Sequence, residues 1–198
     1  RGCPLHCTYC TYPLLEGAAP RVREPDDVVE EIARVKATAD PRGFEFVDAT
    51  FNVPPAHAAA ICDAIAARGL RVALSTMGFN PLGSSPALLG AMRAAGFNAI
   101  MVTPEAASER MLASYEKGFS LDAVERCADE VEGSGIASAW FFMLGGPGET
   151  KDTVEETLRF VERRLRWRDC LVIIGSGVRV FHGSALARTA ADEGRIGG

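Results

Sequence analysis

The sequence has no excess of positive charge. Its 21 Lys and Arg residues are outnumbered by 26 Asp and Glu, which gives a formal net charge of −5 at pH 7. Because no overall basic field attracts polyanions, we expect no nucleic-acid partner. One basic run stands out at 163–168. It lies near the end of a predicted helix, where cations are favoured, and we interpret it as a solvated terminal turn.

Long apolar runs are also missing. No stretch approaches the roughly 20 residues that a membrane-spanning helix needs, and the chain does not open with a signal peptide. We therefore expect a cytoplasmic, reducing setting, which suits free thiols. With 198 residues, of which 47% are hydrophobic and 24% charged, the composition is typical of one globular domain with a sizeable core.

A fourth neighbouring cysteine is missing from the most unusual stretch of the chain. Cys3, Cys7 and Cys10 follow the spacing C-x3-C-x2-C, and the cysteines at 62, 127 and 170 are not spaced to join them. Thiolates select zinc, copper(I) or iron–sulfur clusters, and iron–sulfur clusters normally use four cysteines. A four-iron cluster on these three would leave one iron open to another ligand. A zinc site completed by His6 or a distant residue, and a disulfide framework, are the alternatives.

Short apolar runs alternate with helical periods along the rest of the chain. We predict strands at 43–47, 70–74, 97–102, 136–144 and 170–174, with 178–181 as a continuation of the last. Helical periods separate them, beginning near positions 25, 55, 86, 121 and 151, and a short helix covers 185–191. We predict loops at 11–23 and 75–84. This alternation predicts βαβ units and an α/β fold with a parallel sheet. Periodicity leaves an open sheet and a barrel as alternatives.

The cysteine spacing, with the aromatic Tyr9 directly before the last cysteine, resembles the signature of the radical S-adenosylmethionine (radical SAM) enzymes. The resemblance implies a partial (β/α)6 TIM-like barrel. It also implies that Cys3, Cys7 and Cys10 hold a 4Fe–4S cluster whose fourth iron binds S-adenosylmethionine (SAM). In this family the cysteine loop follows the first barrel strand, and this chain begins two residues before Cys3. We therefore expect residues 1–198 to be the radical SAM core domain, with its first strand upstream and absent.

Polar residues at two predicted strand ends resemble further motifs of the family. Asp48 stands where many relatives have a Gly-Gly-Glu element that contacts SAM. Both glycines are absent, and the pattern is similar to the cobalamin-binding branch. The stretch 103–108 is similar to the ribose motif, which implies that Glu105 and Ser108 bind the ribose or the amino group of SAM. The alternatives are a turn cap for Asp48 and a favourable first-turn charge for Glu105.

The glycine-rich stretch 145–150 follows an apolar strand and resembles the family's turn that packs against adenine. A phosphate loop of the usual form is excluded, because its lysine is missing. The resemblance implies that Gly146 and Pro147 contact SAM, since glycine lets a ligand approach the backbone closely. It also implies that Tyr9 faces the adenine side. If the resemblance to the family is set aside, the stretch 145–150 indicates only a tight strand-to-helix turn. We assign no role to Lys117 or His182, and no catalytic residue beyond the cluster ligands.

The resemblance thus implies an enzyme that cleaves SAM reductively to a 5′-deoxyadenosyl radical. The cobalamin-associated branch implies an upstream cobalamin domain and a methyl transfer or other radical modification of a small molecule, lipid or natural product. The expected electron donor is a flavodoxin or ferredoxin. One alternative is a cobalamin-independent radical SAM enzyme, similar to the methylthiotransferases. The other, of a different class, is a zinc-stabilised α/β binding module.

Overall fold

The computed structural model describes residues 1–196, which form one sheet of five parallel strands. The strands lie side by side in chain order, β1-β2-β3-β4-β5. Their bounds are β1 Phe44–Phe46, β2 Leu74–Phe79, β3 Phe97–Glu105, β4 Ala137–Leu144 and β5 Cys170–Ser176. The predicted parallel α/β fold is therefore confirmed, and the sequential strand order is that of a partial barrel.

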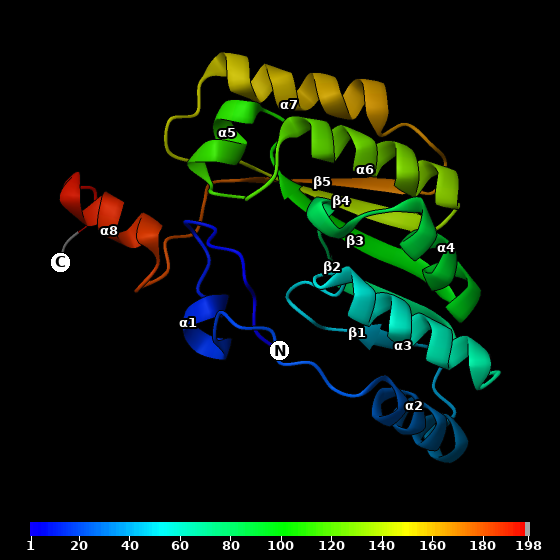
Figure 1. Ribbon diagram of the computed structural model, residues 1–198. Helices are drawn as coiled ribbons and strands as arrows, with labels where there is room; N and C mark the ends of the chain where they lie inside the picture. The colour runs from blue at the N-terminus through cyan, green and yellow to red at the C-terminus, as the bar shows by residue number, and fades with distance from the viewer. Residues whose placement is uncertain (197–198) are drawn as a thin grey trace.

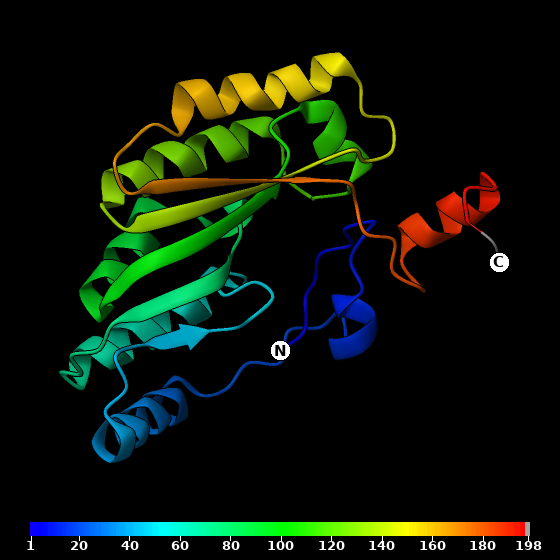
Figure 2. The ribbon, with the colours of Figure 1, turned by 180° about the vertical axis from the view of Figure 1, so that it is seen from behind.

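The helices that follow strands β1 to β4 connect them and lie on one face of the curved sheet, whereas the first and last helices of the chain lie away from that layer (Figures 1 and 2). The opposite face carries half-buried side chains such as Phe141 and Met143 of β4. The sheet is therefore a segment of barrel wall with its helices outside. The helices are α1 Tyr12–Glu16, α2 Pro25–Ala39, α3 Pro55–Ala67, α4 Pro86–Ala95, α5 Glu109–Ser114, α6 Leu121–Ser134, α7 Lys151–Arg164 and α8 Ala185–Asp192, with a 3-10 turn, η1, at Pro81–Gly83.

Several helices begin at a hydroxyl side chain that accepts a hydrogen bond from the first turn. Ser85 accepts from the Leu88 N–H at 3.2 Å and Ser184 accepts from the Ala187 N–H at 3.1 Å. Thr150 and Thr153 bond reciprocally at the start of α7. Such caps satisfy donors that have no partner within the helix, and they fix where each strand-to-helix connection ends.

The main core lies between the sheet and the outer helices. Trp140 and Phe142 of β4 are fully buried, and both rings lie near the ring of Phe160 in α7. The Trp140 indole N–H donates to the Ser138 hydroxyl at 3.1 Å, so this buried donor is satisfied. The alternation of buried and half-buried residues along β4 follows the two faces of a strand.

Three local predictions were wrong. The second strand is Leu74–Phe79 instead of 70–74, so most of it falls in a stretch predicted as a loop. The stretch 178–181 is not a continuation of β5, which ends at Ser176. A short helix, α1, occupies part of the predicted loop at 11–23. The polar sequence of β2 forms a strand because both its neighbours supply ladder partners: Ser75 is paired with Glu45 and Ala99.

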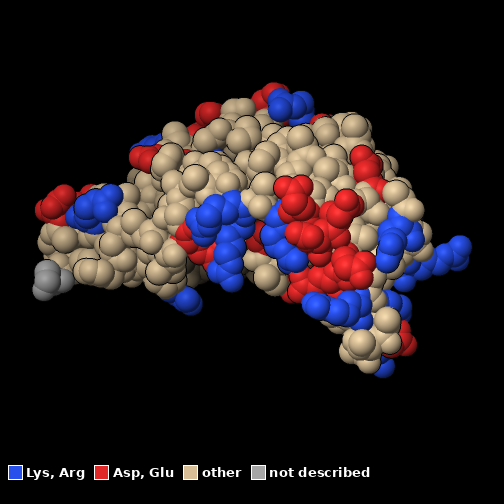
Figure 3. Space-filling view, turned by 60° about the horizontal axis from the view of Figure 1, so that its bottom comes forward, with Lys and Arg blue, Asp and Glu red and all other residues tan. Residues whose placement is uncertain are grey.

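Acidic and basic side chains lie next to one another on the face shown in Figure 3. Ion pairs such as Arg23–Glu31 and Arg68–Glu30 join side chains that are largely exposed. In the part of the chain that the structure describes, none of the helices has the length and apolar character needed to cross a membrane.

Candidate cofactor site at the strand ends

The N-terminal cysteine loop is bound to segments that follow the strands. The Thr8 N–H donates to the Tyr115 carbonyl at 3.0 Å, and the Thr8 hydroxyl donates to the Ser114 carbonyl at 3.3 Å. The Thr8 carbonyl accepts from the Leu186 N–H at 2.8 Å. The loop is therefore held against the α5 region and the start of α8, beside the carboxyl ends of the sheet (Figure 1).

All three cysteines of the loop are free thiols. Cys3 is buried, while Cys7 and Cys10 are half-buried. The Cys10 N–H donates to the Cys7 carbonyl at 3.0 Å, and the Tyr12 N–H donates to the Cys10 sulfur at 3.4 Å. Burial is the main cause that raises the pKa of the Cys7 and Cys10 thiols. Cys10 and Cys3 raise the pKa of Cys7 further, and Cys3 raises that of Cys10, while Lys117 opposes the rise at both.

The donor set fits an iron–sulfur cluster, because thiolates on one short loop are the ligands such clusters use. Among residues 1–196, however, no three or more Cys, His, Asp or Glu side chains are already gathered as metal ligands. Ligands commonly converge only when the metal binds. The assignment of Cys3, Cys7 and Cys10 as cluster ligands therefore stays a prediction.

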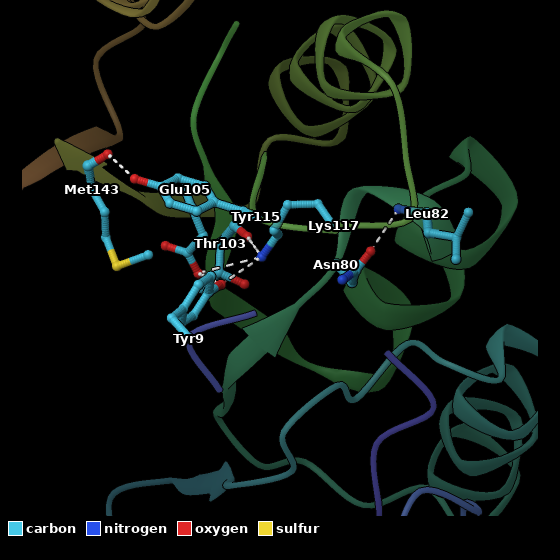
Figure 4. Close-up of polar contacts among 8 residues, drawn as sticks. All are labelled: Tyr9, Asn80, Leu82, Thr103, Glu105, Tyr115, Lys117 and Met143. Carbon is cyan, nitrogen blue, oxygen red and sulfur yellow. Dashed lines mark hydrogen bonds and ion pairs between the residues drawn. The ribbon is translucent and has the colours of Figure 1, made fainter. Parts of the chain in front are cut away.

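Tyr9, Glu105 and Lys117 form a buried polar network that joins the cysteine loop to the end of β3 (Figure 4). The Tyr9 hydroxyl donates to Glu105 Oε1 at 3.1 Å. Lys117 Nζ donates to the Tyr9 hydroxyl at 3.0 Å and to the Thr103 carbonyl at 3.1 Å, and it lies 3.5 Å from Glu105 Oε1. Glu105 is 7% exposed to solvent and Lys117 is 3% exposed. Charges so shielded from water interact strongly.

Glu105 has two unusual features. Its φ of 68° lies in the left-handed region, which is uncommon for residues other than glycine and marks strained positions that cluster at functional sites. Its Oε1 atom is bonded, but Oε2 is buried without a partner. Burial raises the pKa of the Glu105 carboxyl, while Lys117 and the hydrogen bonds oppose that rise. The free oxygen suits a ligand that donates N–H or O–H.

Ser108 lies near the same strand end and is fully buried, and its hydroxyl also has no hydrogen-bond partner. It precedes α5 but makes no side-chain cap. The segment between Glu105 and Ser108 is fixed by the Ala107 N–H, which donates to the Thr157 hydroxyl of α7 at 3.1 Å. Buried polar atoms are rarely left unpaired, so each of these two oxygens is a candidate acceptor for a bound ligand.

The glycine-rich turn after β4 lies against Tyr115. A side chain at Gly146 would place its Cβ only 2.2 Å from the Tyr115 hydroxyl oxygen. The Pro147 carbonyl accepts from the Ser114 hydroxyl at 2.7 Å, and the Gly145 N–H donates to the Glu149 carboxylate. The turn also borders a cavity of about 530 Å³ that is lined on its other side by residues 178–196.

Tyr115 connects this turn with the cysteine loop. Its hydroxyl donates to the Met143 carbonyl at 3.3 Å, and its ring meets the ring of Tyr9 edge-on at 5.5 Å (Figure 4). Tyr9, Glu105, Gly146 and their neighbours are thus brought together through Tyr115 and Lys117. Neither connecting residue had been singled out as a site residue. The signal that could have indicated Lys117 is the Lys-Gly-Phe stretch 117–119 in a chain with only three lysines.

Asp48 lies apart from this network. It borders a second cavity, of about 540 Å³, with Arg1, Phe51 and His57. Its carboxylate is 4.0 Å from the terminal amino group of Arg1, and in residues 1–196 no hydrogen bond or ion pair joins it to Tyr9, Glu105 or Lys117. A role for Asp48 in binding SAM therefore stays a prediction.

The loop that carries Asp48 is fastened to the end of β2 by two buried asparagines. The Asn52 amide donates to the Asn80 carbonyl and accepts from the Asn80 N–H, both at 2.7 Å. The Asn80 side chain in turn accepts from the Leu82 N–H at 2.8 Å (Figure 4). Paired buried amides of this kind fix a loop without leaving polar groups unsatisfied.

Two known proteins resemble the chain in sequence. The chain is 29% identical over 168 residues to "Uncharacterized methyltransferase PH0819" of Pyrococcus horikoshii, covering 82% of this chain and 35% of that protein. It is 27% identical over 161 residues to the "Anaerobic magnesium-protoporphyrin IX monomethyl ester cyclase" of Rubrivivax gelatinosus, covering 80% of this chain and 29% of that protein. The chain thus spans about a third of the length of these relatives.

Solved structures share the fold. TsrM from Kitasatospora setae, a radical SAM methyltransferase with cobalamin and a [4Fe–4S] cluster bound, superposes with a TM-score of 0.86 at 22% identity, over 97% of this chain and 35% of that one. OxsB, a cobalamin-dependent radical SAM enzyme with aqua-cobalamin and SAM bound, has a TM-score of 0.82 at 14% identity, over 98% and 34% of the two chains. The sequence profile of the Radical SAM superfamily matches residues 1–161. The chain therefore belongs to the radical SAM superfamily.

Proposed function

We propose that residues 1–198 are the radical SAM core of an enzyme, with Cys3, Cys7 and Cys10 as the ligands of a 4Fe–4S cluster. One observation carries the proposal. Tyr9, which lies between Cys7 and Cys10 in the sequence, donates a hydrogen bond to Glu105, and the other carboxyl oxygen of Glu105 is buried without a partner. When bound and reduced, the cluster supplies the electron that cleaves SAM to a 5′-deoxyadenosyl radical. The chain orients SAM and keeps water away.

The unpaired oxygens support a proposal for how SAM lies in the site. Glu105 Oε2 and the Ser108 hydroxyl would accept from the amino group or the ribose hydroxyls, which are the donors that SAM offers. Gly146 and Pro147 would lie along the adenine, because the glycine leaves the backbone open to close approach. Tyr9 would border the adenine side, and Asp48 would contact the methionine end across the second cavity.

For the whole protein, we propose a cobalamin-dependent methyl transfer or related radical modification. A methyltransferase and a tetrapyrrole cyclase are among its relatives by name, and cobalamin is bound in structures of similar fold. The substrate class would be a small molecule, lipid or natural product. We further propose a flavodoxin or ferredoxin as electron donor and a cytoplasmic location.

Anaerobic reconstitution with iron and sulfide, followed by absorption spectroscopy and metal analysis, tests the core of this proposal. We expect a brown protein with about four irons per chain, as a 4Fe–4S cluster requires. A colourless protein that retains one zinc would favour the zinc-stabilised binding module. Adding hydroxocobalamin to the whole protein separates the two radical SAM alternatives, because the cobalamin-independent one gains no tightly bound cobalamin absorption.

Cys7→Ala is the sharpest variant for the cluster. We expect loss of the brown chromophore with the helical circular dichroism retained, because Cys7 lies on a loop outside the core between sheet and helices. Cys170→Ala is the matched control, since Cys170 is also a half-buried free thiol but lies at the start of β5. An unchanged spectrum in Cys7→Ala, or equal loss in the control, would rule out this ligand.

A further inference from the structure

Lys117 is a cation whose donors are all used inside the protein. An ammonium group has three N–H donors and accepts nothing. Its three acceptors are the Tyr9 hydroxyl, the Thr103 carbonyl and Glu105 Oε1. The residue is 3% exposed, and its Nζ lies 5.7 Å from the centre of the Tyr9 ring and 5.6 Å from that of Phe119. No donor of Lys117 is left over for a ligand.

The backbone around Lys117 is shaped to turn this side chain inward. It lies in the short link between α5 and α6, flanked by two residues with left-handed backbones, Glu116 at φ 50° and Gly118 at φ 73°. The Lys117 N–H donates to the Leu112 carbonyl of α5 at 3.1 Å. Residues other than glycine adopt this conformation at a cost, and burying a charge adds a further cost. A lysine on the protein surface would require neither the left-handed backbone beside it nor the burial of its charge.

We infer that Lys117 is a positioning residue that fixes Glu105 and Tyr9 relative to each other, so that Glu105 Oε2 faces the SAM site and the cysteine loop stays in register with it. This inference rests on the proposed function. Lys117 binds one oxygen of Glu105 and the hydroxyl that shares it, which leaves only the other oxygen for a ligand. Without Lys117, the carboxyl group can rotate and the tie between loop and strand is weakened.

SAM affinity in the reconstituted protein tests this role. Lys117→Met removes the charge at similar length, Tyr9→Phe removes only the shared hydroxyl, and Lys117→Arg restores a cation. Lys151→Met is the control, because Lys151 is an exposed lysine on α7. We expect Lys117→Met to keep the iron content but weaken SAM binding about tenfold or more, because Glu105 Oε2 is then no longer held toward the ligand. The change in the electron paramagnetic resonance spectrum on adding SAM should shrink in parallel.

Three further readouts separate positioning from a merely structural role. Lys117→Arg should recover part of the SAM affinity. The losses in Lys117→Met and Tyr9→Phe should not add in the double variant, because both act through one network. In the cluster-free protein, amide hydrogen exchange of residues 8–10 should speed up in Lys117→Met and not in Lys151→Met.

Each outcome decides one question. A wild-type protein without a cluster or without SAM binding refutes the proposed function. A wild-type protein that binds both, with Lys117→Met equal to it, refutes the inference about Lys117 alone. Fully additive losses in the double variant also contradict it. If Lys117→Met does not fold, Tyr9→Phe decides, and a Tyr9→Phe protein with unchanged SAM affinity and unchanged exchange overturns the inference.

Discussion

At the residue scale, the main feature of the candidate site is the buried ion pair between Glu105 and Lys117. Removing water from two charges is costly, and breaking such a pair by truncating one partner usually costs more than replacing both. The pair joins β3 to the α5–α6 link. Its loss should therefore lower the free energy of unfolding of the protein as well as disturb the candidate site.

A stability cycle in the cluster-free protein checks this. At pH 7 we expect Lys117→Met to lower the free energy of unfolding by about 3–5 kcal/mol, because it leaves a buried carboxylate unpaired. The double variant Glu105→Gln/Lys117→Met should recover part of that loss. Urea denaturation followed by circular dichroism measures both, with Lys151→Met expected within about 0.5 kcal/mol of wild type. A double variant no more stable than Lys117→Met would contradict the coupling.

The cysteines outside the loop should be chemically inert in the native protein. Burial raises the pKa of the Cys62 and Cys127 thiols to about 12, so only about one in ten thousand is thiolate at pH 8, and the thiolate is the reactive form. Iodoacetamide labelling followed by mass spectrometry should leave both unmodified in the folded chain and modify both after denaturation. Rapid native labelling of either residue would contradict their burial.

Individual site residues could be predicted from the sequence where the motif that indicates them lies within a few neighbouring positions. The spacing of the cysteines and the polar residues at 105 and 108 could be recognised from a few neighbours in the chain. Lys117 and Tyr115 could not be assigned, because their partners are remote: Lys117 bonds with Tyr9, 108 positions away, and the ring contact between Tyr9 and Tyr115 spans a similar separation.

Among the elements, the turn after β4 has a shape that requires glycine at position 146. Gly146→Ala would drive a methyl group into the Tyr115 ring, since the Cβ position is 2.2 Å from the hydroxyl oxygen and 2.4 Å from a ring carbon. We expect a loss of about 1–3 kcal/mol in unfolding free energy, as for overpacked sites, with weaker SAM binding in the reconstituted protein. Thermal unfolding and equilibrium dialysis measure the two effects.

Gly90→Ala is the matched comparison for that variant. A Cβ at Gly90, inside α4, meets nothing within 4 Å, and alanine is the better helix former by about 1 kcal/mol. The same methyl group should therefore stabilise the protein at position 90 and destabilise it at position 146. Similar shifts in melting temperature at both positions would show that the contact with Tyr115 is not what matters.

Strand β2 shows where prediction of elements failed. Its sequence, Leu74–Phe79, contains Ser75, Thr76 and Gly78 and no long apolar run, so local preference favoured the apolar residues before it. The strand exists because it is paired on both edges, with β1 and β3. Gly78 is needed there, because a Cβ would meet the Asp48 carbonyl oxygen at 2.2 Å. Tertiary pairing outweighed propensity, as is common for strands.

Across the whole molecule, charge is mixed instead of separated. The net charge is −5, and the basic run at 163–168 includes Arg164, which is paired with Asp129 of α6. We expect only weak, salt-sensitive nucleic-acid binding. Fluorescence anisotropy with a labelled duplex should show no saturable binding at about 150 mM salt, where surface charges are largely screened. Tight binding that persists there would contradict this expectation.

The architecture as a whole was predictable from the regular alternation of strand and helix, which gave the parallel sheet and its order of elements. The choice between an open sheet and part of a barrel was not, because the same periods fit both. That choice depends on how far each strand is rotated from its neighbour, which is a property of packed side chains and not of sequence period.

The hydrogen bonds of Thr8 with Tyr115 and Leu186 also determine when, during synthesis of the protein, the cysteine loop can be held in place. A ribosome makes the cysteines well before Leu186, so at about 5–20 residues per second roughly ten to forty seconds pass before the segments that fasten their loop exist. During that interval the cysteines are as exposed to oxygen as any nascent thiol. A cluster held by this loop, as proposed above, would therefore be inserted into its fastened site only after Leu186 has been made, and the yield of loaded protein would depend on how the thiols are protected until then.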